Sequence, residues 1–137
     1  MLNTFDAIEM GDVEVAFMQS EPRRKKLINF DNKTFCLQTN SRNGTSNSDT
    51  VFHYQQNANI VTAKFGGGNV ICGTIIALHR GDHLDMIYQM LTATDELKSG
   101  KAVAKIVSTA NEKIQLELDW EWLTDSGNKG TSVYLEQ

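Results

Sequence analysis

The chain has 137 residues, with 17 Asp and Glu against 13 Lys and Arg and a hydrophobic content of 40%. This length suits one domain with a real core that buries roughly two-thirds of the surface of the unfolded chain. The mildly acidic balance excludes a global attraction to nucleic acid or to anionic membranes. No stretch approaches the ~20 apolar residues of a membrane-spanning helix, so we expect neither a nucleic-acid nor a membrane partner.

Residues 1–26 differ from the rest and are predicted to form an N-terminal extension to a domain over residues 27–137. The first residues lack the bases and the long apolar stretch of a signal peptide, which predicts a cytoplasmic location. Alternation over 13–17 favours a strand, and a helix from residue 5 onward stays open. The basic block Arg23–Lys26 is expected to be a solvated linker, with phosphate contact as the alternative. The extension is expected either to pack on the domain or to form a homo-oligomer.

Eight β-strands are predicted beyond residue 33, because short apolar or alternating runs follow one another between turn-forming residues. Their ranges are Thr34–Thr39, Thr50–Gln56, Ile60–Phe65, Val70–His79, His83–Ala93, Lys101–Thr109, Lys113–Leu123 and Thr131–Glu136. Short connections place each strand beside its predecessor in an antiparallel meander. Closing the meander removes both unpaired edges. The sequence therefore predicts an all-β, eight-stranded up-and-down barrel of the lipocalin or avidin (calycin-like) type.

The turn Gly81-Asp82 indicates which side chains of the two strands that flank it face inward. A two-residue turn there pairs Arg80 with His83 and fixes the faces of both strands. The nearly uncharged face consists of Gly73, Ile75, Ala77, His79, Leu84, Met86, Tyr88 and Met90. We predict that this face lines the interior. The other face mixes apolar and polar residues, which would suit a cover provided by the N-terminal extension or by a second subunit.

The seventh predicted strand alternates apolar residues, Trp120 and Trp122 among them, with the acids Glu117, Asp119 and Glu121. Burying each tryptophan gains roughly 2–3 kcal/mol, whereas burying the acids costs several kcal/mol per charge. We therefore predict that the tryptophans lie inside and the acids outside. General acid–base catalysis by these acids at the barrel mouth is the enzymatic alternative.

No other group of residues predicts a metal, cofactor or catalytic site. The histidines do not converge, since the hairpin register puts His79 and His83 on opposite faces. The glycines at 66–68 precede a strand rather than a helix, which indicates a hairpin turn and not a phosphate cradle. Cys36 and Cys72 are far apart in sequence and are expected to be reduced, buried and inert.

From residue 29 onward the chain resembles a family of small bacterial proteins that are often labelled N-acetylglutamate synthase. The matching stretches are N-F-D-N-K-T-F at 29–35, T-V-F-H-Y at 50–54, N-I-V-T-A-K-F at 59–65, G-G-G at 66–68, D-M-I-Y at 85–88, E-L-K-S-G-K at 96–101, W-E-W at 120–122 and G-T-S at 130–132. The label implies a synthase, which would act at the barrel mouth. The acetyl-CoA loop Q/R-x-x-G-x-G/A of acetyltransferase-type synthases does not occur in this sequence, so no catalytic residue is carried over.

The sequence thus predicts non-enzymatic binding of a small, partly apolar ligand inside the barrel. The ligand-binding residues are predicted to be Tyr54, Tyr88, Trp120 and Trp122, since aromatic walls with a few polar groups are typical of such pockets. A filled barrel without a ligand cavity stays open as the alternative, because eight strands enclose only a small interior. In that case the four rings fill a solid core, and the barrel is an oligomeric interaction module.

Overall fold

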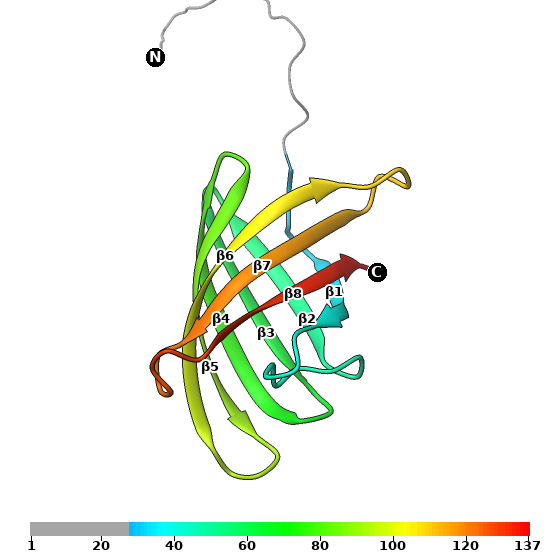
Figure 1. Cartoon of the computed structure of the whole chain (residues 1–137). Coiled ribbons are helices and arrows are strands. Elements are labelled where there is room, and N and C mark those ends of the chain that lie inside the picture. Colours follow the sequence, from blue (N-terminus) through cyan, green and yellow to red (C-terminus); the bar gives the residue numbers. More distant parts are fainter. Residues whose placement is uncertain (1–27) are drawn as a thin grey trace, which may run out of the picture.

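The computed structural model describes residues 28–137, which form one closed antiparallel barrel (Figure 1). Over this range the strands are β1 (Lys33–Asn40), β2 (Val51–Asn57), β3 (Ile60–Gly67), β4 (Val70–Arg80), β5 (His83–Thr92), β6 (Leu97–Ser108), β7 (Ile114–Trp122) and β8 (Lys129–Glu136). Each strand pairs with the next, and β8 returns to β1. The predicted eight-stranded up-and-down barrel is confirmed. No helix in these residues is long and apolar enough to cross a membrane.

The predictions for the N-terminal extension, residues 1–26, lie outside the described residues. They concern its strand or helix, its basic block Arg23–Lys26 and its contribution to an oligomer.

The predicted faces of the central hairpin and of β7 are also confirmed. Arg80 pairs with His83, and the even-numbered partners of β5 point into the core. Trp120 and Trp122 are buried on the inner face of β7, whereas Glu117 is exposed on its outer face. The alternation of apolar and acidic residues thus sets which way this strand faces.

Two sequence expectations are wrong. The sixth strand begins at Leu97 rather than at Lys101, because the strand continues through Gly100. Its lack of a side chain leaves room for the ring of Tyr88, which lies opposite it on β5. The cysteines are not both buried: Cys36 is half-buried, and Cys72 is exposed because its neighbour Gly73 faces inward.

The two ends of the barrel are closed in different ways. At the end that leads to the N-terminus in Figure 1, Phe30 is fully buried and forms a plug. The ring centroid of Phe30 lies 6.1 Å from that of Phe35, 5.8 Å from that of Tyr54 and 5.6 Å from that of His79. The opposite end is covered by loop 41–50, which joins β1 to β2.

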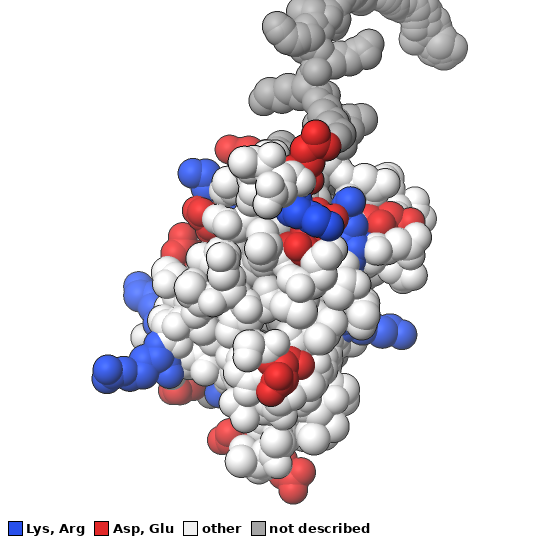
Figure 2. Space-filling model, turned by 90° about the vertical axis from the view of Figure 1, so that its right-hand side faces the viewer, with Lys and Arg blue, Asp and Glu red and all other residues white. Residues whose placement is uncertain are grey.

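Charged side chains are distributed unevenly over the outer surface. Figure 2 shows the side of the barrel that carries the C-terminus, where Lys, Arg, Asp and Glu are most frequent toward the plugged end. One ion pair there joins Lys33 to Glu136, with 3.3 Å between Nζ and Oε2. This pair fixes β1 to β8 at the point where the barrel closes.

Candidate ligand site inside the barrel

Three of the four aromatic residues predicted to bind a ligand lie together inside the barrel, near loop 41–50. The ring centroid of Trp122 lies 5.7 Å from that of Tyr88 and 5.6 Å from that of Trp120. Tyr54 is apart from them, because it packs against Phe30 at the plugged end. The structure therefore groups Tyr88, Trp120 and Trp122 and leaves Tyr54 in the plug.

A cavity of about 40 Å³ lies between these three rings and a second aromatic group. In that second group Phe52 stacks on Phe65, with centroids 4.6 Å apart, and meets Tyr134 edge-on at 4.8 Å. Thr45 and Ser46 of loop 41–50 also line the cavity. Such a volume holds only a few water molecules, so the barrel is nearly filled while the loop covers it.

Glycines on neighbouring strands allow two of the rings to lie flat against the barrel wall. A Cβ atom at Gly100 would lie 2.5 Å from Oη of Tyr88, and one at Gly130 would lie 2.6 Å from Cζ2 of Trp120. Both glycines pair directly with the residue whose ring covers them. Any larger residue at these positions would push the ring toward the cavity.

A chain of hydrogen bonds connects Trp120 to loop 41–50. Nε1 of Trp120 donates to Oγ of Ser132 at 2.7 Å, and Oγ of Ser132 donates to Oδ1 of Asn40 at 2.5 Å. Nδ2 of Asn40 then donates to the carbonyl oxygen of Ser46 at 2.9 Å. The loop is thereby tied to the cavity wall through the buried Ser132 and the half-buried Asn40.

The indole of Trp122 has no such partner. Within residues 28–137 its Nε1 is the one buried side-chain nitrogen or oxygen that lacks a hydrogen bond. An unpaired buried donor costs about 1–3 kcal/mol. Nζ of Lys98 lies 4.3 Å from the centroid of the same ring and donates to Oγ1 of Thr45 in loop 41–50 at 3.1 Å. The cavity wall thus presents an unused donor close to a cation.

Sequence patterns do not identify the polar residues of this site as a group. Asn40 and Lys98 stand near the ends of their strands, where alternation is weakest, and nothing in the sequence around Ser132 indicates a polar contact. Only the closure of β8 onto β1 brings Ser132 within reach of Asn40. Recognising them would have required the full strand register.

The acids and histidines lie away from the cavity. Glu117 and Asp119 are exposed on the outer wall, and no Asp, Glu or His lines the cavity among the described residues. His79 is inside the plugged end, where Nδ1 lies 3.3 Å from Nε2 of Gln56. Residues 28–137 contain no group of three or more His, Cys, Asp or Glu that could hold a metal ion.

Burial raises the pKa of Tyr54, Tyr88 and Tyr134, which are all the tyrosines of the chain. Desolvation of the phenolate is the main cause. The folded state therefore keeps protons that the unfolded state releases near pH ~10. The stability contributed by these groups is complete below that pH and is lost as the pH rises above it.

We expect absorbance at 295 nm, which reports phenolate, to rise only together with the loss of the β-sheet circular dichroism signal. A tyrosine that ionises with an ordinary pKa in the folded protein would contradict this burial.

A family model described as "Avidin-like protein" matches residues 28–137. The chain belongs to the avidin-like family. Comparisons with curated proteins and with solved structures found no match. The avidin-like match covers the whole described barrel, including the aromatic cavity and loop 41–50. It also agrees with the resemblance of residues 27–137 to a family of small barrels.

Proposed function

We propose that this avidin-like protein binds a small, partly apolar molecule in the barrel interior beneath loop 41–50, without chemical conversion. The observation that carries the proposal is the buried, unpartnered Nε1 of Trp122 beside a cavity walled by aromatic rings. Aromatic walls with a few directed polar groups are typical of ligand pockets. Avidin-like barrels typically bind small ligands, which supports the same function.

Binding requires loop 41–50 to move. Ligand pockets usually measure about 300–1,000 Å³, well above the volume that is free beneath the loop. The loop contains no large apolar side chain. Its central residues 44–46 are held by individual hydrogen bonds, including those from Asn40 to Ser46 and from Lys98 and Asn69 to Thr45, whereas Ser41, Asn43 and Thr50 anchor the two ends of the loop. Each such bond contributes about 1 kcal/mol net, so a ligand that stacks on the exposed rings can offset their loss.

The groups around the cavity define the chemistry of the ligand. Tyr88, Trp120 and Trp122 favour a flat molecule that stacks on aromatic faces. Nε1 of Trp122 is a donor only, so the ligand needs an acceptor oxygen or nitrogen. Nζ of Lys98 lies over the ring of Trp122 and favours an acceptor with negative charge.

A screen for thermal stabilisation by flat carboxylates and related metabolites tests the proposal. A ligand at about 100 times its Kd adds roughly 2.7 kcal/mol to the free energy of unfolding. Ligands that stabilise the protein are then followed through the indole N–H signals in ¹H–¹⁵N spectra. The chain has two tryptophans, so assignment needs one variant, Trp122→Phe.

We expect bound ligand to shift the indole signal of Trp122 more than that of Trp120, whose Nε1 already donates to Ser132. Trp122→Phe keeps an aromatic face, removes the donor and should weaken binding about tenfold, or ~1.4 kcal/mol. Leu123→Ala, next to it but exposed, is the control and should bind normally. Unchanged affinity in Trp122→Phe, or a screen without any stabilising ligand, would refute the proposal.

A further inference from the structure

We infer that Asn43 in loop 41–50 is a site of spontaneous deamidation, and that its conversion to an acid releases the loop from β8. Asn43 is followed by Gly44, and this is the one Asn-Gly pair in the whole sequence. Asparagine is a thermolabile residue, and a following glycine has no side chain to shield its backbone nitrogen. Asn43 is exposed, so water and hydroxide reach it.

The reaction at Asn43 needs only water. The backbone nitrogen of Gly44 loses its proton to hydroxide and attacks Cγ of Asn43. The bond from Cγ to Nδ2 breaks, and ammonia leaves with a proton from solvent, which gives a five-membered imide. Water then breaks one of the two bonds from the ring nitrogen to a carbonyl carbon. The product is aspartate or isoaspartate, formed without oxidation or reduction, and either one adds a negative charge.

Packing of the loop requires glycine at position 44. A Cβ atom at Gly44 would overlap the side-chain amide of Asn40. That amide accepts from Ser132 and donates to Ser46, so it cannot move aside without breaking the hydrogen-bond chain that holds the loop. The fit that closes the loop therefore excludes any side chain that would shield Asn43 from attack.

The closed loop restrains the reacting groups. The backbone nitrogen of Gly44 donates to the carbonyl oxygen of Ser41 at 3.0 Å, which closes a four-residue turn. Oγ of Ser41 donates to Oδ1 of Asn43 at 3.0 Å. Attack on Cγ requires both groups to leave these partners. The rate of deamidation therefore follows how often the turn opens.

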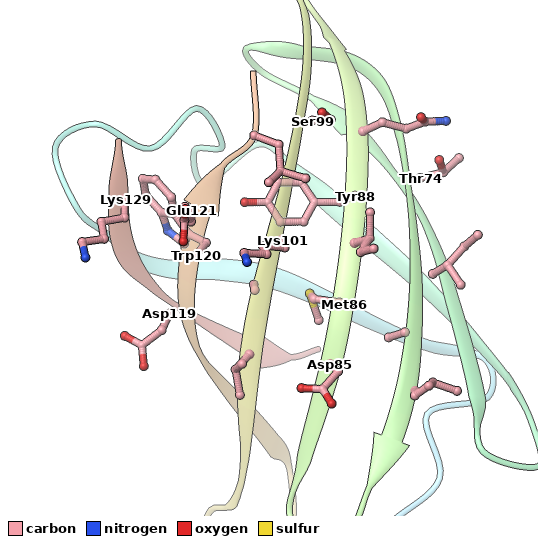
Figure 3. A pocket seen from close by; sticks show the side chains of 18 residues that line it. Thr74, Asp85, Met86, Tyr88, Ser99, Lys101, Asp119, Trp120, Glu121 and Lys129 are labelled. Carbon is pink, nitrogen blue, oxygen red and sulfur yellow. The ribbon is translucent and has the colours of Figure 1, made fainter. Parts of the chain in front are cut away.

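The side-chain amide of Asn43 anchors the loop to β8 and to the residue before it. Nδ2 of Asn43 donates to Oδ1 of Asn128 at 2.5 Å and to the carbonyl oxygen of Lys129 at 2.9 Å. Lys129 is the first residue of β8 and lies beside Glu121 of β7 (Figure 3). Both partners of Nδ2 are acceptors, so only a donor fits between them.

A carboxylate at position 43 leaves this anchor without a donor. An ionised carboxylate only accepts hydrogen bonds, so it would face the oxygens of Asn128 and Lys129 with no proton between them. Rotation of the Asn128 amide does not restore the contact. Its Nδ2 already donates to Oδ2 of Asp125 at 2.8 Å, and rotation would place its oxygen against that carboxylate instead. An ion pair with the exposed side chain of Lys129 offsets little, since exposed ion pairs are weak.

Deamidation of Asn43 and release of the loop do not require a ligand. Faster exchange of a ligand beneath the loop would follow from the release, and that consequence alone rests on the proposed function. The experiment therefore uses the full chain without any ligand, so that its failure leaves the proposed function untouched.

The first measurement follows deamidation of the folded full chain by peptide mass spectrometry during incubation at mildly alkaline pH. We expect Asn43 to gain the mass difference between NH₂ and OH, whereas Asn47 keeps its amide. Asn47 is the internal control, because it lies in the same loop and precedes serine rather than glycine. An unchanged Asn43 in the folded protein would overturn the inference.

The second measurement compares amide hydrogen exchange in Asn43→Asp, which carries the added charge from the start, with that in the wild type. The amides of Ser41 and Gly44 donate to Thr131 and Ser41 in the closed loop. We expect both amides to exchange about tenfold faster in Asn43→Asp, because two hydrogen bonds of the closed loop are lost. Equal exchange rates in Asn43→Asp and the wild type would show that the charge does not release the loop, and would overturn the inference.

Asn47→Asp is the matched control variant, since it makes the same chemical change in the same loop. Within the described residues Nδ2 of Asn47 donates no hydrogen bond, and Oδ1 accepts from the backbone nitrogen of Asp49, as a carboxylate also can. Its exchange rates should stay at the wild-type level, and circular dichroism checks that both variants keep the barrel. Equal acceleration in Asn47→Asp would make the effect one of charge on the loop in general and would contradict a specific anchor at Asn43.

Discussion

Replacing Phe30 with alanine should lower the free energy of unfolding by about 3–5 kcal/mol. The ring is fully buried and contacts Phe35, Tyr54 and His79, so its removal leaves a cavity in the plugged end of the barrel. Domains of this size are stable by about 5–15 kcal/mol, so this one change removes a large part of the total. Urea denaturation followed by circular dichroism measures the loss.

The matched control is Ile71→Ala, which removes a large apolar side chain that is already exposed. Its effect should stay within about 0.5 kcal/mol. Phe30→Leu should fall between the two, because it keeps part of the plug. If Phe30→Ala cost less than about 1 kcal/mol, the plug would contribute little, and Tyr54 would have to be buried by other contacts.

Replacing Ser132 with alanine should cost about 2 kcal/mol and should loosen loop 41–50. The change removes the hydroxyl that accepts from Trp120 and donates to Asn40. Nε1 of Trp120 is then left buried without an acceptor, and Asn40 loses the donor on its other side. Chemical denaturation measures the stability, and cleavage by trypsin after Arg42, an exposed loop residue, measures the opening of the loop.

Thr131→Ala changes the adjacent, outward-facing residue of β8 and serves as the control. It should leave both stability and cleavage at Arg42 unchanged. We expect Ser132→Ala to be cleaved several times faster than the wild type under conditions in which the barrel remains folded. Equal cleavage rates would show that the hydrogen-bond chain does not restrain the loop.

The architecture could be predicted because it depends on local patterns. Alternation of tryptophan and acid in β7 was enough to orient that strand, and the Gly81-Asp82 turn was enough to set the register of β4 and β5. The same local pattern leaves Gly100 outside the sixth predicted strand, since its role depends on the ring of Tyr88 on the paired strand. Local patterns therefore predicted the strands well but missed a strand start that depends on a ring from the neighbouring strand.

The site could be predicted only in part. Aromatic residues on inward faces were visible, but their position along the barrel was not, so Tyr54 was grouped with three rings at the other end. The bond between Ser132 and Asn40 joins residues 92 positions apart. Phe30 stands among turn-forming residues without any periodicity, and only the closed ring of strands makes it a plug.

The plug at Phe30 also has a kinetic consequence for the proposed ligand. With that end blocked, a molecule in the cavity arrives and departs by the same route, past loop 41–50. If the loop recloses over the ligand, a change that only eases its opening raises kon and koff by the same factor and leaves Kd unchanged. A change in the wall, such as Trp122→Phe, acts mainly on koff. Residence time and affinity can therefore be tuned separately in this barrel.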